Sequence, residues 1–168
     1  NGNKSGKFSD ELETYVEVPS DVVPFEQRPW MKCAEITDKL IEALEAGEYT
    51  YYRVNFPYGD MVGHTGSLLA TRCSMEALDL QLARILTVVD KLGGVALITA
   101  DHGNADNAVN EDGTPNTAHS LNPVPIVVVS DRVHVVKDGI LADVAPTVLR
   151  LMGLKQPAEM TGEVLVEM

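Results

Sequence analysis

The chain has 168 residues, which is long enough to bury a substantial core and most simply forms one domain. Its hydrophobic content of 45% and charged content of 23% are ordinary for a globular protein, and no apolar run approaches the roughly 18 residues of a membrane span. The formal net charge of −12 argues against a nucleic-acid-binding or anionic-membrane surface, so we expect neither partner.

The two cysteines, Cys33 and Cys73, are too few for a disulfide framework, and no signal-peptide pattern opens the chain. We therefore expect a reducing, cytoplasmic compartment. The first residue is Asn1 rather than Met, and residues 1–6 resemble the interior of a loop. These features predict that the chain is a piece of something longer.

In chain order, hydrophobic patterns predict a strand at 12–18, a helix at 32–45 that ends at Gly47, and a strand at 51–56. A second helix starts at Leu68 or Thr71 and ends before Gly93. Its expected buried stripe consists of Met75, Leu78, Leu82, Ile85 and Val89.

The second half of the chain predicts strands at 95–100 and 124–129, separated by a polar loop, and a short edge strand at 133–136. A final helix is expected to start with Asp143 as its cap, to hold Pro146 in its first turn and to stop at Gly153. Helices that alternate with apolar strands imply an α/β fold, with a mostly parallel sheet covered on both faces as a three-layer α/β/α sandwich.

Three of the four histidines follow predicted strands or precede one in polar, glycine-punctuated loops: His64, His102 and His119. Two of them have an acid nearby, Asp60 four residues before His64 and Asp101 directly before His102. Neighbouring strands would bring these loops to one edge of the sheet, where α/β proteins bind ligands. The fourth histidine, His134, is expected only to face one side of an edge strand.

Carboxylate oxygens and imidazole nitrogens together suit Mn²⁺ or Zn²⁺, and five such ligands exceed what one catalytic ion usually takes from protein. Two ions about 4 Å apart are a typical arrangement for phosphoryl transfer. Taken singly, Asp60 is also compatible with a helix cap, Asp101 with a turn residue, and each histidine with an exposed loop side chain. The combination favours a metal site.

Several motifs resemble the cofactor-independent phosphoglycerate mutases, which belong to the alkaline phosphatase superfamily of metalloenzymes. They are DMVGHTG at 60–66, TADHGNAD at 99–106, His119 with NPVP at 122–125, QRPWMK at 27–32, GILADVAPT at 139–147 and MTG at 160–162. Their order and separations also match, so the resemblance covers nearly the whole chain. It implies an alkaline-phosphatase-like fold, incomplete in this chain.

By that resemblance, Asp60, His64 and His119 would hold one Mn²⁺, and Asp101 with His102 would hold a second; Zn²⁺ or Co²⁺ are the alternatives. The family interconverts 3-phosphoglycerate and 2-phosphoglycerate in glycolysis through a phosphoserine, without a bisphosphoglycerate cofactor. No motif for the nucleophilic serine occurs here, so no catalytic residue is assigned.

The resemblance also implies that residues 1–168 are the C-terminal portion of the phosphatase-type domain. The N-terminal part and the inserted transferase domain, which grips the substrate, would be missing, so the chain alone should be inactive. Two other hypotheses remain open. One is another phosphatase or phosphomutase of the same superfamily, and the other is a non-catalytic metal-binding module.

Overall fold

The computed structural model describes residues 6–168, so most of the loop expected at residues 1–6 lies outside the described residues. Its helices are α1 (Cys33–Ala46), α2 (Tyr58–Gly63), α3 (Leu68–Lys91) and α4 (Val144–Leu151), with 3-10 turns at η1 (Phe25–Gln27), η2 (Ala105–Asn107) and η3 (Leu141–Asp143). The strands are β1 (Ala96–Thr99), β2 (Ile126–Val129), β3 (Val135–Val136) and β4 (Val166–Glu167). In the described part of the chain, no helix combines the length and the apolar character needed to cross a bilayer.

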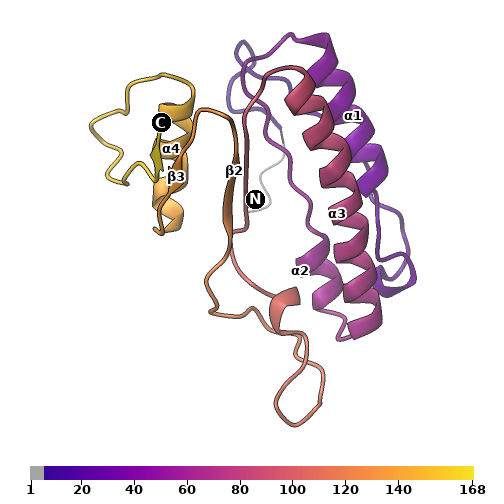
Figure 1. The fold of residues 1–168 in the computed structure, drawn as a ribbon. Helices are drawn as coiled ribbons and strands as arrows, with labels where there is room; N and C mark the ends of the chain where they lie inside the picture. Colours follow the sequence, from indigo (N-terminus) through magenta and orange to yellow (C-terminus); the bar gives the residue numbers. More distant parts are fainter. Residues whose placement is uncertain (1–5) are drawn as a thin grey trace.

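Helices α1 and α3 pack against each other, and the short α2 packs on α3 (Figure 1). The predicted ends of the two long helices are confirmed. Gly47 follows α1 with φ 65°, and its N–H donates to the carbonyls of Ala43 and Leu44. At the start of α3, the Ser67 hydroxyl accepts a hydrogen bond from the Ala70 N–H.

The buried stripe of α3 differs from the expected one. Ile85 and Val89 are buried as predicted, but Met75 is 41% exposed, and Leu78 and Leu82 are only partly buried. The rest of the buried face consists of small or polar side chains: Ala70, Thr71, Ser74 and Gln81. Since both α1 and α2 pack on α3, position along this shared face decides burial more than hydrophobicity does.

The prediction of a mostly parallel sheet is wrong for the described residues. β1 pairs antiparallel with β2, Ala96 opposite Val129, and β3 pairs antiparallel with β4. Parallel neighbours need a crossover connection, usually a helix. The chain between β1 and β2 instead doubles back as a long hairpin, with a further antiparallel bridge between Gly103 and Ser120.

Two other expected strands are absent from the described structure. Residues 12–18 and 51–56 have no regular secondary structure. A strand exists only where a neighbour completes its backbone hydrogen bonds, and no described segment pairs with either of them. β2 also starts later than expected, after Pro125, which has no N–H to donate to a ladder.

The C-terminal elements α4, β3 and β4 gather on one side of β2, opposite α1 and α3 in Figure 1. Asp143 is the N-cap residue of α4 as predicted, but its side chain makes no capping hydrogen bond to this helix. Its buried carboxylate instead accepts hydrogen bonds from the backbone N–H groups of Ile140 and Glu163, at 2.8 and 2.7 Å. It therefore ties the C-terminal tail to the turn before α4.

Candidate metal centre

The first two candidate residues are Asp60, which lies in α2, and His64, which follows the C-terminal end of this helix. Tyr58 and Val62, four residues apart, are 1% and 0% exposed and anchor the helix. Burial of a side chain such as Val62 stabilises a protein by about 1.5–3 kcal/mol. The i, i+4 spacing repeats on the outer face, where Asp60 Oδ1 lies 3.0 Å from His64 Nε2. His64 therefore caps a short helix rather than lying in the loop that we expected.

His102 and His119 come together through the hairpin between β1 and β2. His102 and His119 directly precede Gly103 and Ser120, which form an antiparallel bridge, so both histidines lie beside this bridge. The two imidazoles stack, with ring centroids 3.7 Å apart and planes inclined by 16°. The sequence predicted that these loops meet, but an antiparallel turn brings them together and not the edge of a parallel sheet.

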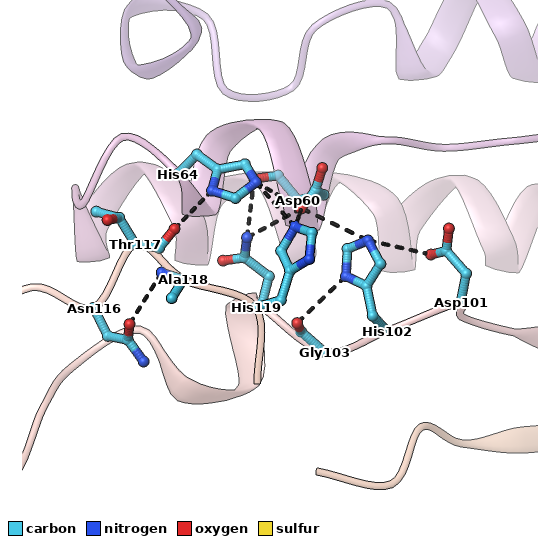
Figure 2. Close-up of polar contacts among 10 residues, drawn as sticks. Asp60, His64, Asp101, His102, Gly103, Asn116, Thr117, Ala118 and His119 are labelled. Atoms are coloured by element: carbon cyan, nitrogen blue, oxygen red, sulfur yellow. Dashed lines mark hydrogen bonds and ion pairs between the residues drawn. The ribbon is translucent and has the colours of Figure 1, made fainter. Parts of the chain in front are cut away.

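The two segments converge on one carboxylate oxygen, Asp60 Oδ1 (Figure 2). His119 Nε2 lies 3.0 Å from this oxygen, and 3.2 Å from His64 Nε2. His102 Nε2 is farther from it, at 4.0 Å. Asp101 is not part of this group: its side chain is 77% exposed, and its Oδ1 lies 3.7 Å from the Nε2 of His102, which is at the edge of the group.

Hydrogen bonds to backbone carbonyls set the orientation of two of the imidazoles. His64 Nδ1 lies 2.6 Å from the Thr117 carbonyl oxygen, and His102 Nδ1 lies 3.4 Å from that of Gly103. A carbonyl only accepts, so each Nδ1 carries the proton, and in the neutral ring each Nε2 keeps a lone pair. His64 Nε2 thus faces Asp60 and His119, the orientation that a metal ligand requires.

The distances among Asp60 Oδ1, His64 Nε2 and His119 Nε2 are 3.0, 3.0 and 3.2 Å. Ligands about 2.0–2.1 Å from a tetrahedral ion lie about 3.3 Å apart, close to these edges. The three ligand atoms all lie within 4.8 Å of one another. Their side chains are 32–48% exposed, so an ion and a phosphate could reach them from solvent.

A second carboxylate fastens the hairpin that carries His102 and His119. Asp106 accepts hydrogen bonds from Ser120 Oγ and Asn122 Nδ2, each at 2.7 Å. These two donors, the Asn122 amide first, lower the pKa of Asp106 below its ordinary value. A Cβ at Gly103 would overlap Ser120 Oγ on the opposite arm of the hairpin and lie 2.6 Å from Asp106 Oδ1, so a side chain here would disturb the bond between these two residues.

Sequence reasoning missed the roles of Asn104, Thr117 and Asp106. Asn104 is 4% exposed and donates to Asp60, and the carbonyl of Thr117 orients His64. Asn104 and Asp106 are part of the TADHGNAD motif, so their closeness to two candidate ligands was a usable signal. A backbone carbonyl such as that of Thr117 has no sequence signature.

Comparison with known proteins identifies the superfamily of this chain. Residues 1–156 match the metalloenzyme superfamily. The chain is 45% identical, over 95% of its length, to a 2,3-bisphosphoglycerate-independent phosphoglycerate mutase of Trypanosoma brucei brucei, and 48% identical, over 99%, to that of Akkermansia muciniphila. It covers 32% of each of these relatives, so it spans about a third of their length.

A solved structure supports the same relationship. The crystal structure of Leishmania mexicana phosphoglycerate mutase at low cobalt concentration matches 99% of this chain with a TM-score of 0.88 and 41% identity, over 34% of that protein. The resemblance first seen in short motifs therefore extends along the chain at the level of sequence and fold. By these matches, the chain belongs to the metalloenzyme superfamily and resembles the cofactor-independent phosphoglycerate mutases.

Proposed function

We propose that this chain is the metal-binding, C-terminal portion of a cofactor-independent phosphoglycerate mutase. The whole enzyme would interconvert 3-phosphoglycerate and 2-phosphoglycerate through a phosphoserine in the cytoplasm. It would need no bisphosphoglycerate. The relatives extend well beyond the matched third, and we assign the nucleophilic serine and the substrate-binding transferase domain to that additional sequence. The same sequence would complete a three-layer α/β/α sandwich around β1 and β2.

The observation that carries this proposal is the triangle formed by Asp60 Oδ1, His64 Nε2 and His119 Nε2, with edges of 3.0–3.2 Å. Two imidazole nitrogens and a carboxylate oxygen that face one another at this distance form a ligand set that a cation between them would hold together. We propose Mn²⁺ as the ion, with Zn²⁺ and Co²⁺ as alternatives. A bound ion would neutralise charge on a phosphoryl group.

Each residue of the triangle has a part in this chemistry. Asp60 supplies the only negative charge of the three and offsets part of the cation's charge. His64, held by the Thr117 carbonyl, keeps its Nε2 aimed at the site without a change of rotamer. His119 is stacked on His102, so its ring is also restrained, and the set leaves an open side toward solvent.

Asp101 and His102 are proposed as ligands of a second ion. They offer one oxygen and one nitrogen 3.7 Å apart at the edge of the first site. Two ligands are fewer than a catalytic ion normally takes from protein. We therefore expect the second ion to bind weakly to this chain, and the chain alone to lack mutase activity, since it has no assigned nucleophile.

A chimera tests the function. This chain would replace the matching third of the Trypanosoma brucei brucei relative, and formation of 2-phosphoglycerate would be followed by coupled spectrophotometry. We expect activity in the chimera, loss of activity on Asp60→Ala or His119→Ala, and retention on His134→Ala, since His134 is an exposed histidine outside the site. A folded, metal-loaded chimera that hydrolyses phosphate esters without mutase activity would instead indicate another phosphatase of the superfamily. A folded, metal-loaded chimera that neither isomerises phosphoglycerate nor hydrolyses phosphate esters would indicate a non-catalytic metal-binding module.

A further inference from the structure

Asn104 is a buried polar residue in direct contact with the candidate metal centre. It is 4% exposed, and its Nδ2 lies 3.1 Å from Asp60 Oδ1 and 3.4 Å from the Asp60 carbonyl oxygen. Both neighbours are acceptors, so the amide nitrogen must face them. Asn104 therefore donates to the same carboxylate oxygen that lies 3.0 Å from His64 and His119.

The other end of this amide is held in an unfavourable place. Asn104 Oδ1 is buried and has no hydrogen-bond partner within the described part of the chain. It lies against the backbone of Gly63, where an added Cβ would overlap it. An unpaired buried carbonyl destabilises the fold, so the orientation of this side chain is explained by its contact with Asp60 and not by its own hydrogen bonding.

We propose that Asn104 is a positioning residue for the metal centre, an inference that rests on the metal site proposed above. Its N–H occupies one lone pair of Asp60 Oδ1 and leaves the other directed between His64 and His119. A neutral amide does this without placing a positive charge beside the cation, as lysine or arginine would. Gly63 has no side chain because the Asn104 amide occupies that space.

The experiment measures Co²⁺ binding to the 168-residue chain by its visible absorption, in competition with a chelator of known affinity. Asn104→Leu removes the donor and keeps the branched shape with the same number of side-chain heavy atoms, whereas Gly63→Ala keeps the donor and displaces it. Asn107→Ala is the matched control, since Asn107 is an exposed asparagine of the same loop. Circular dichroism and the melting temperature of the metal-free protein show that each variant is folded at the temperature used.

We expect Co²⁺ affinity to fall about 10–100-fold in both site variants, with an altered absorption spectrum of the bound ion, and to stay unchanged in the control. A role in folding alone would lower the melting temperature and leave the affinity and spectrum of the folded protein unchanged, which would overturn the inference. If Asn104→Leu does not fold, Gly63→Ala decides by the same criterion. If the unaltered chain binds no Co²⁺, the metal site itself is refuted. If the unaltered chain binds Co²⁺ and both variants bind it equally well, only the positioning role of Asn104 is refuted.

Discussion

Replacing Asp60 by asparagine removes one negative charge from the centre of the candidate site and keeps the shape of the side chain. The variant oxygen can still accept the bond from Asn104 Nδ2, which spans 3.1 Å in the structure. The fold of the metal-free chain should therefore change little. The affinity for a divalent cation should fall, because the ion loses its only anionic partner in the triangle.

The exposure of the site sets the magnitude. Asp60, His64 and His119 are 32%, 43% and 48% exposed, so water screens the charges and a high dielectric constant applies. A doubly charged ion about 2.1 Å from a carboxylate oxygen gains about 4 kcal/mol at a dielectric constant of about 80, which corresponds to about 10³-fold in affinity. A buried site would have implied a much larger loss.

Thermal unfolding with and without Mn²⁺ is the assay. At a metal concentration about 100 times the Kd, binding stabilises a protein by about 2.7 kcal/mol, or about 5–11 °C in a chain of this size. We expect that shift in the unaltered chain and less than about 1 °C in Asp60→Asn. Asp101→Asn makes the same chemical change at an acid outside the triangle, 77% exposed, and should keep most of the shift. An equal shift in Asp60→Asn, or loss of the shift only in Asp101→Asn, would refute the reasoning.

Three further predictions concern the framework around the site. Gly66→Ala should lower the free energy of unfolding, measured in urea titrations, by more than the about 1–2 kcal/mol that φ 72° alone costs, since its Cβ would also lie 3.0 Å from that of Pro115. Gly113→Ala is the control, because Gly113 has φ 83° but open space around its Cβ position. An equal loss of stability in both variants would show that the contact with Pro115 contributes nothing. Thr147→Val should cost about 1–3 kcal/mol by the same titrations, because the fully buried hydroxyl donates to the Asp143 carbonyl at 2.7 Å and accepts a backbone N–H at 3.0 Å; a neutral effect would contradict these bonds. Two backbone N–H groups lower the pKa of Asp143, so the stability that this carboxylate contributes is present above its unfolded pKa of about 3.9 and lost as pH falls through the lower folded value. Urea titrations from pH 7 to pH 3 should show a smaller loss of stability in Asp143→Asn than in the unaltered chain, and identical pH profiles would contradict this.

Local features of the chain were readable from sequence where the determinant is itself local. Helices α1 and α4 end shortly before Gly47 and Gly153, whose φ values of 65° and 72° are in the left-handed region. Strand pairing was misjudged because it depends on the partner. Residues 51–56 have strand-forming side chains but no neighbour to pair with in the described structure.

The candidate site shows the same division. Asp60 and His64 lie four residues apart, so helix geometry alone brings them together. That His119 joins them depends on the hairpin, and that Asp101 stays outside depends on its exposed position beside His102. The ligand roles remain predictions that the metal titrations test.

The chemical inventory of this protein can be read from its sequence: the helices α1, α3 and α4 with their ends, the strand-forming runs, and the carboxylates and imidazoles of its motifs, but not the short helix α2. Tertiary contacts set the antiparallel pairing of β1 and β2, the triangle of three atoms at Asp60 Oδ1, and the contact of the buried Asn104 with this oxygen. The physical reason is range. Backbone propensity and helical spacing act over a few residues, whereas the triangle joins α2 to a hairpin more than fifty residues later in the chain.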